Sequence, residues 1–332
     1  MNAPVKLWCN DLWYPEAAEG FRRHPLFQLL EKRFEIALDS RAPDFLLYSV
    51  RSDFLRYRCP RIFYTGENLR PDFAECDFAL SFDYDIPGRN YRLPVYVLDD
   101  LSPLLDRPSC IAEKTKFCNF IYSNKKCIAR NMFCRMLSEY KRVDSPGCVL
   151  NNMPRLPYDQ TRQQKIEFMR RYKFTIAFEN SSSPGYTTEK IADAFAAGTV
   201  PIYWGNPDIA KEFNPDAFIN CHDFPDLDSV VRHVIAVDKD DALFTRYLQA
   251  PPFRGNALPP CAQTGRMLDF FAEVFANPPR PCAADKLYSR LLRLTPRFVN
   301  KRIMRARRRE SNVIRHFQES KTPQLINAVN GE

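Results

Sequence analysis

The stretch that decides the fold is YKFTIAFENSSSPGYTTEKIADAFAAGTVPIYWG, residues 172–205. Residues 174–178 are apolar and predict a buried strand, which runs into a polar loop containing serine and glycine. The loop leads to Glu189 and Lys190 at the start of a helix, and a second apolar strand follows at 200–204. This order of strand, loop, helix and strand predicts an open α/β sheet. Such sheets bind phosphorylated ligands where strand ends and helix amides converge.

A carboxylate beside an amine at a helix start suits a nucleotide sugar. Glu189 would accept hydrogen bonds from ribose hydroxyls, and Lys190 would face the diphosphate. Each residue also has an ordinary structural explanation. A glutamate in the first turn of a helix is stabilised by the helix dipole by about 0.3–1 kcal/mol, and a lysine on a helix is commonly exposed. Only the combination of the two, with Tyr186 nearby, favours a binding site.

Strands and helices alternate along most of the chain. Residues 25–38 predict a helix, because the apolar side chains from Phe27 to Leu38 recur near a 3.6-residue period. Other helices are predicted at 130–140, 163–172, 227–237 and 265–276, and strands at 5–9, 45–50, 61–64, 78–81, 93–98, 117–122 and 217–220.

This alternation in both halves predicts an α/β protein with two Rossmann-like, doubly wound domains facing a cleft. Residues 99–108 are rich in proline and acid and predict a linker. We therefore expect an N-terminal α/β domain at 1–108, a C-terminal α/β domain at 109–280, and a basic helical tail at 281–332.

The net charge of +8 is concentrated in the tail. Residues 286–315 hold eleven Lys or Arg against Glu310, so the rest of the chain carries −2. Leu287, Leu291 and Leu294 lie at i, i+4 and i+7 there, which predicts a basic amphipathic helix in peripheral contact with an anionic membrane. The alternative is a solvated helix end or a basic extension. Nucleic-acid binding is disfavoured, because the run carries no stacking platform or groove-reading motif.

The cysteines and acidic pairs give no sign of a metal site. The eleven cysteines contain no CxxC pair, which indicates buried, reduced thiols. Asp83-Tyr84-Asp85 and Asp238-Lys239-Asp240 look like metal-binding DxD motifs, but such three-residue patterns are common by chance. The first residues contain no signal peptide, and no run of about eighteen apolar residues predicts a membrane span. We expect a cytoplasmic protein with peripheral contact to the inner face of a bacterial membrane.

Two long motifs carry a resemblance to a known family. FENSSSPGYTTEK at 178–190 and AGTVPIYWGNPDIAKEFNPDAFINCHDF at 197–224 resemble the signature of glycosyltransferase family 10, the α1,3/4-fucosyltransferases, and its bacterial members above all. Supporting matches are FYTGEN at 63–68, YRLPVY at 91–96, and an SN-then-RN pattern from Ser123 to Asn131. The resemblance covers about residues 60–225.

The resemblance implies a GT-B architecture and an inverting transfer. The N-terminal domain would bind the acceptor and the C-terminal domain GDP-fucose. Fucose would pass to the 3-hydroxyl of GlcNAc in a Galβ1-4GlcNAc acceptor, giving a Lewis X-type glycan. Alternatives within enzymes are α1,4-transfer to type 1 acceptors or the use of another GDP-sugar. The alternative outside enzymes is a basic membrane- or nucleic-acid-binding protein whose α/β part is only a scaffold.

The same resemblance implies residue roles. Glu67 matches the catalytic base, although a glutamate after glycine in a turn is usually just solvated. Arg130 and Lys190 would hold the donor phosphates. The alternative for Arg130 is a surface arginine or an ion pair within its helix. Other donor-pocket residues would be Ser123, Asn124, Asn180, Tyr186 and Glu189.

Two of these residues have an ordinary structural alternative. Asn180 could instead be a turn residue, and Tyr186 a packed core residue. Glu179 is expected to support or orient the substrate, and to serve as the base should Glu67 prove remote. Because Arg130 and Lys190 supply phosphate neutralisation, the transfer would require no cofactor or metal, with a divalent cation at most stimulatory.

Overall fold

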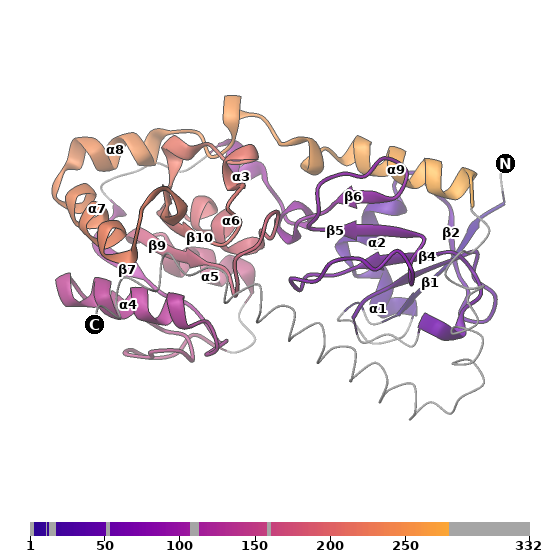
Figure 1. The fold of residues 1–332 in the computed structure, drawn as a ribbon, viewed down its shortest axis with the longest axis horizontal. Coiled ribbons are helices and arrows are strands. Elements are labelled where there is room, and N and C mark those ends of the chain that lie inside the picture. The colour runs from indigo at the N-terminus through magenta and orange to yellow at the C-terminus, as the bar shows by residue number, and fades with distance from the viewer. Residues whose placement is uncertain are drawn as a thin grey trace. The chain divides into compact units, whose positions relative to one another are not determined.

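The computed structural model describes residues 3–10, 12, 18–50, 54–106, 113–157 and 161–278. These residues form two compact units, each built on a parallel sheet (Figure 1). The described residues up to 99 and those at 260–278 make the first unit, and the described residues at 100–259 belong to the second. The tail expected at 281–332 lies outside the described residues.

The sheet of the first unit has six strands in the order β2-β1-β3-β4-β5-β6, and every pair is parallel. Side chains of β3, β4 and β5 are buried along their whole length, because both faces of the sheet are covered. The predicted strands at 5–9, 45–50, 61–64 and 78–81 are therefore confirmed. The strands are β1 Val5–Asn10, β2 Ile36–Leu38, β3 Phe45–Tyr48, β4 Arg61–Tyr64, β5 Phe78–Ser81 and β6 Asn90–Arg92.

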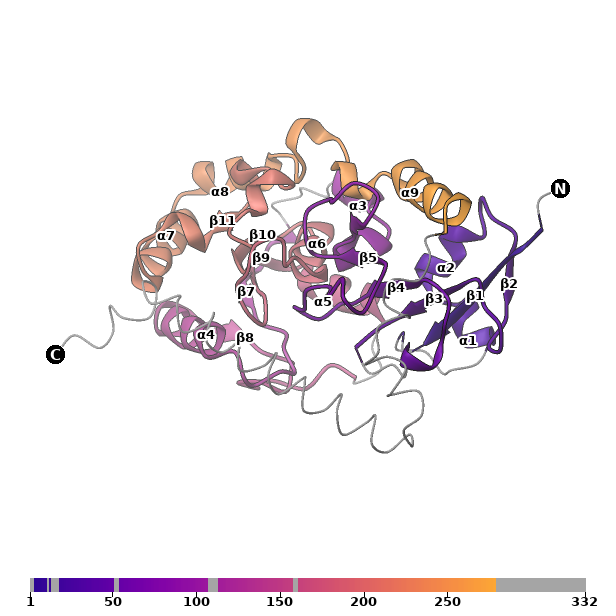
Figure 2. The ribbon, with the colours of Figure 1, turned by 45° about the vertical axis from the view of Figure 1, so that its right-hand side comes forward.

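Three helices pack against one face of this sheet: α1 Ala18–Arg22, α2 Pro25–Leu30 and α9 Thr264–Ala276 (Figures 1 and 2). The predicted helix at 25–38 is too long. It ends after Leu30, and Ile36 pairs with Val5 at the edge of the sheet. The strand predicted at 93–98 is also wrong. Pro94 precedes a short 3₁₀ helix there, and the strand lies at β6 instead.

The domain boundary expected at 280 requires correction. Helix α9 belongs to the first unit, because Met267, Phe270 and Phe271 join the apolar core formed by strands β1 and β3–β6. The hydroxyl of Tyr91 also donates to the carbonyl of Cys261, at 3.0 Å. At the other boundary, the expected linker contains helix α3 Ser102–Leu105, which packs on the second unit.

The second sheet has the order β11-β10-β9-β7-β8 and is also parallel. Its strands are β7 Lys116–Asn119, β8 Val143–Asp144, β9 Tyr172–Phe178, β10 Val200–Trp204 and β11 Ile219–Asn220. The chain runs from β7 outward to β8 and then returns past β7 to β9. The boundary between β7 and β9 is therefore the topological switch point, where ligands bind in open α/β sheets.

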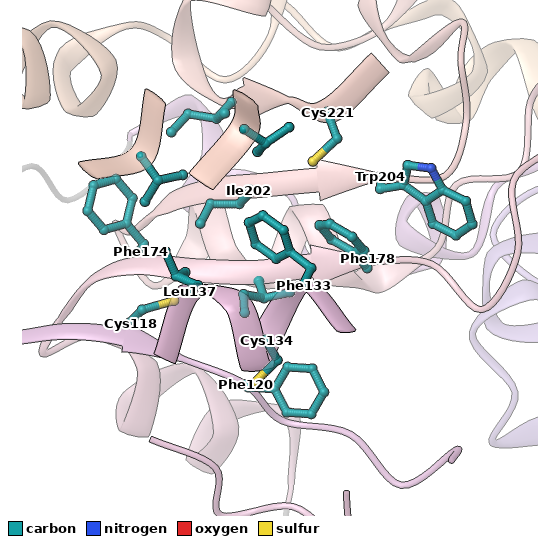
Figure 3. Close-up of a cluster of buried hydrophobic side chains, with 14 of the residues drawn as sticks. Cys118, Phe120, Phe133, Cys134, Leu137, Phe174, Phe178, Ile202, Trp204 and Cys221 are labelled. Atoms are coloured by element: carbon teal, nitrogen blue, oxygen red, sulfur yellow. The ribbon is translucent and has the colours of Figure 1, made fainter. Parts of the chain in front are cut away.

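Helices cover both faces of this second sheet, as a doubly wound fold requires. Apolar side chains of α4, α7 and α8 pack on one face, which Figure 3 shows through Phe133 and Leu137 of α4 against Phe174 and Phe178 of β9. On the other face, helix α6 packs on β9 and β10, and helices α3 and α5 pack against α6. The bounds are α4 Ile128–Tyr140, α5 Arg162–Met169, α6 Glu189–Ala196, α7 Leu227–Lys239 and α8 Asp241–Gln249.

Two sequence expectations concern thiols and membrane spans. The cysteines that the structure describes are free and mostly buried, but Cys148 is exposed, which differs from the expectation of buried thiols. Within the described ranges, the helices are too short or too polar to span a bilayer.

His24 makes the stability of the first unit depend on pH. The residue caps α2, with its buried Nδ1 accepting a hydrogen bond from the Leu26 amide at 3.2 Å. Burial lowers the pKa of His24 to about 4. Between that value and the ordinary pKa near 6.5 the unfolded chain binds the extra proton, so stability falls as pH falls through this window. We expect a loss of about 2 kcal/mol between pH 7 and pH 5 from this residue.

Urea unfolding at pH 7 and pH 5, compared with His24→Asn, measures this contribution. Asparagine caps helices well and does not titrate, so the variant should lose about 2 kcal/mol less than the parent between the two pH values. Equal losses in the two proteins would show that His24 is not responsible.

Candidate active site

A buried carboxylate lies where β9 ends. The side chain of Glu179 has no exposed surface. Its Oε1 accepts the backbone amide of Thr188 at 2.7 Å, and its Oε2 accepts the Thr188 hydroxyl at 2.7 Å and the ammonium group of Lys190 at 3.0 Å. Glu179 thus joins the end of β9 to the first turn of α6. With both oxygens occupied and no exposed surface, it suits a supporting role and not that of a base.

Lys190 is the centre of this network. Its Nζ also donates to the Thr188 hydroxyl at 2.7 Å and to Glu189 Oε1 at 3.2 Å. Burial alone would lower the pKa of Lys190, but Glu179 and Glu189 raise that pKa well above its ordinary value. Lys190 is therefore firmly cationic, and it is not the exposed helix lysine of the ordinary interpretation.

The pKa values of the two carboxylates shift in opposite directions. Burial raises the pKa of Glu179, and the positive charge of Lys190 opposes that shift. Burial would also raise the pKa of Glu189, but Lys190 and Lys165 outweigh it and lower this pKa to about 2. Glu189 keeps 35% of its side-chain surface exposed, so an ionised carboxylate is available to a ligand.

Arg130 holds other residues of the site in place, on the side opposite Lys190. Its guanidinium group is fully buried and lies 3.8 Å from the centre of the Tyr122 ring. It donates to the Asn180 amide oxygen at 3.0 Å and to the backbone carbonyl of Asn124 at 2.6 Å. Arg130 thus holds two other predicted site residues in place. It forms no ion pair within its helix and is not a surface arginine.

A cavity of about 730 Å³ opens at the switch point between β7 and β9. This volume is typical of small-molecule sites. Of the predicted donor-binding residues, five line it: Ser123, Asn124, Asn180, Glu189 and Lys190. Tyr186 is not among them. Its side chain is 1% exposed, so the packed-core interpretation holds for Tyr186 in place of the pocket role. Arg130, which is fully buried, is also absent from the cavity wall.

One wall of this cavity, the loop at 145–157, is not predicted from the sequence. Ser145 and Asn152 exchange hydrogen bonds at its base, where the Ser145 amide donates to the Asn152 side chain at 2.8 Å. The Asn151 side chain donates to the carbonyls of Ser145 and Met153. Gly147 lies so close to Tyr122 that a Cβ would be 2.6 Å from its backbone nitrogen. A glycine and two asparagines after a short strand were the available signal.

Glu67 belongs to the first unit. It lies in the turn after β4, where its backbone amide donates to the Thr65 hydroxyl at 3.0 Å, and its side chain is exposed. An exposed carboxylate at the end of a strand is compatible with binding a ligand. Its role as a base stays a prediction.

The two acidic motifs have structural partners. Asp238 is 2% exposed and binds Lys141, Lys173 and the Tyr140 hydroxyl. Asp83 pairs with Arg70, and Asp85 accepts the Arg92 amide at 2.7 Å. Within the described ranges, no group of three His, Cys, Asp or Glu side chains is arranged to hold a metal ion.

The chain matches two family profiles that together span most of its length. Residues 12–99 match the N-terminal domain of the α-(1,3)-fucosyltransferase FucT, and residues 111–250 match the C-terminal part of glycosyltransferase family 10 (fucosyltransferase). The chain therefore belongs to the glycosyltransferase family 10 fucosyltransferases.

Individual relatives agree with this assignment. The chain is 33% identical over 275 residues to the α-(1,3)-fucosyltransferase FucT of Helicobacter pylori, covering 70% of this chain and 56% of that protein. It thus spans little more than half the length of this relative. It is 32% identical over 146 residues to the human 3-galactosyl-N-acetylglucosaminide 4-α-L-fucosyltransferase FUT3, covering 43% of this chain and 38% of that protein.

A solved structure confirms the two-domain GT-B-type fold of parallel Rossmann-like sheets. The crystal structure of an α1,3-fucosyltransferase with GDP-fucose superposes with a TM-score of 0.69 at 27% identity. The match covers 86% of this chain and 92% of that chain.

The close approach of Gly205 to Glu179 is testable. A Cβ at position 205 would lie 2.8 Å from Glu179 Cβ and 2.9 Å from the Tyr203 hydroxyl. We expect Gly205→Ala to lower the free energy of unfolding by about 1–3 kcal/mol, because these buried groups must move. The control is Gly265→Ala, where no heavy atom lies within 4 Å. Urea unfolding measures the free energy of unfolding of both variants. An equal, small effect at the two positions would show that the contact between Gly205 and Glu179 is not tightly packed.

Proposed function

We propose that this protein transfers L-fucose from GDP-fucose to the 3-hydroxyl of GlcNAc in an N-acetyllactosamine-type acceptor, with inversion at the anomeric carbon. The observation that carries the proposal is the Glu179–Lys190–Glu189 network on the wall of the cavity at the switch point. Family membership supports fucose as the transferred sugar, and the relative with bound GDP-fucose supports the donor.

The donor would bind through two neighbouring residues of α6. Glu189, ionised and partly exposed, would accept hydrogen bonds from the ribose hydroxyls. Lys190 would donate to the β-phosphate, which gains charge as the glycosidic bond breaks. Asn180, fixed by Arg130, would contribute an amide beside them. Glu179 would act as a positioning residue that holds Lys190 in place.

The transfer would be a single displacement. The oxygen of the acceptor 3-hydroxyl attacks C1 of β-linked fucose from the face opposite GDP, and the new C1–O bond forms as the bond from C1 to the β-phosphate oxygen breaks. The electron pair of the broken bond leaves with GDP. The hydroxyl proton passes to the carboxylate of Glu67. The product is the α-linked fucoside. Lys190 would stabilise the charge on the leaving diphosphate, and the transfer would require no cofactor.

A second candidate is α1,4-transfer to the type 1 acceptor Galβ1-3GlcNAc. The observation that favours it is the similarity to human FUT3, whose name specifies a 4-fucosyltransferase. That similarity covers 43% of this chain, whereas the similarity to the α-(1,3)-fucosyltransferase of Helicobacter pylori covers 70%. We therefore favour α1,3-transfer.

An acceptor assay distinguishes the two linkages. Purified protein is incubated with GDP-fucose and with either Galβ1-4GlcNAc or Galβ1-3GlcNAc, and the product linkage is determined by NMR. We expect an α1,3-linked product from Galβ1-4GlcNAc at the higher rate. A faster α1,4 product from the other acceptor would select the second candidate, and no product from either would contradict both.

Glu67→Gln tests the base. The amide keeps the shape of the side chain but does not accept the hydroxyl proton. We expect the transfer rate to fall by about 10²–10⁴, while the affinity for GDP-fucose measured by calorimetry stays close to that of the parent. The matched control is Glu273→Gln, which removes an exposed carboxylate from α9 of the same unit. Retention of substantial transfer by Glu67→Gln would assign the base to another residue.

A further inference from the structure

Three cationic side chains line the cavity: Arg155, Lys165 and Lys190. Lys165 binds Asp193 at 2.9 Å. Lys190 is held by two carboxylates, as described above. Arg155 is exposed, and the described residues provide it with no carboxylate partner. Its positive charge is therefore the one on this wall that no described acidic side chain neutralises.

The loop at 145–157 presents Arg155 from a defined backbone. The amide of Leu156, the next residue, donates to the carbonyl of Pro146 at 3.2 Å. Pro146 in turn lies beside Gly147, which packs against the backbone of Tyr122. Leu156 and Pro157 also line the cavity. The side chain is flexible, but the point from which it starts is fixed at the cavity wall.

The charge of the expected ligand requires a further cation. The diphosphate of a nucleotide sugar carries two negative charges, and the cavity contains the ionised Glu189 as well. Lys190 must divide its single charge between this ligand and two carboxylates. Arg130 is buried and is not part of the cavity wall. With Lys165 paired to Asp193 and Lys190 to two carboxylates, the described residues of the cavity leave part of the diphosphate charge without a direct counter-ion.

We propose that Arg155 binds the diphosphate of the nucleotide-sugar donor. A planar guanidinium group suits two phosphate oxygens at once, and such charge-assisted pairs are stronger than neutral hydrogen bonds. The inference rests on the proposed function, since it requires a nucleoside diphosphate in this cavity. It adds a phosphate-binding residue from the loop at 145–157 to those on α6.

The alternative partner for Arg155 is the edge of the purine base, to which arginine donates in many guanine sites. The base is neutral, however, and would leave the charge of Arg155 uncompensated. The diphosphate compensates it. The charge balance of the cavity therefore favours the phosphate.

Calorimetry with three ligands tests the proposal on the full chain. GDP, GMP and guanosine share the base and ribose and differ in phosphate. We expect Arg155→Gln to weaken GDP binding about tenfold, to weaken GMP binding less, and to change guanosine binding less than about twofold. Arg155→Lys should recover part of the loss, and raising the salt concentration should weaken GDP binding less in Arg155→Gln than in the parent.

The matched control is Arg135→Gln, which removes an exposed arginine on α4 outside the cavity and changes the net charge equally. GDP binding by this variant should equal that of the parent.

The other outcomes overturn the inference. Unchanged GDP binding by Arg155→Gln, or a loss shared by Arg135→Gln, would show that Arg155 makes no specific phosphate contact. Equal weakening of GDP and guanosine binding would assign Arg155 to the base. If the parent protein bound GDP no better than guanosine, the proposed donor site itself would fall, and the inference with it.

Discussion

The carboxylate of Glu179 is the constraint around which the candidate site is built. A fully buried acid costs several kcal/mol unless its charge is paired and its oxygens are hydrogen-bonded, and here Thr188 and Lys190 supply both conditions. Because those partners lie at the start of α6, Glu179 fixes the distance between the end of β9 and that helix. The position of Glu189 depends on the same contact, because the helical turn that brings Lys190 to Glu179 also places Glu189 on the cavity wall.

Two other parts of the site use neutral hydrogen-bond acceptors. Among the described residues Arg130 has no carboxylate partner, and it is held by the Asn124 carbonyl, the Asn180 amide and the Tyr122 ring. The loop at 145–157 closes on itself through asparagine side chains. Neither part adds a carboxylate, whereas Glu179 and Glu189 both bind Lys190. In one region of the cavity the positive charge of Lys190 is paired with carboxylates. In the other, the positive charge of Arg155 has no described carboxylate partner.

The sequence predicted the parallel sheets well because buried strands are read directly from apolar runs. It also predicted five of the residues that line the cavity. The prediction from sequence failed where tertiary contacts determine the local structure. The residues after Leu30 have helical periodicity, yet the helix ends there, and pairing of Ile36 with Val5 places Ile36–Leu38 in a strand. Tyr186 and Arg130 are buried by neighbours distant in sequence, and the hydrogen bonds that shape the loop at 145–157 leave no periodic pattern.

Helix α9 has a consequence for biosynthesis. The strands of the first sheet leave the ribosome early, but the helix that covers part of their apolar face is encoded only after the whole second unit. Proteins fold during synthesis from the N-terminus, so the part of this face that α9 covers stays exposed until α9 has been synthesised. A gene fragment ending near residue 108 would lack α9, and its product would expose this apolar surface and be prone to aggregate.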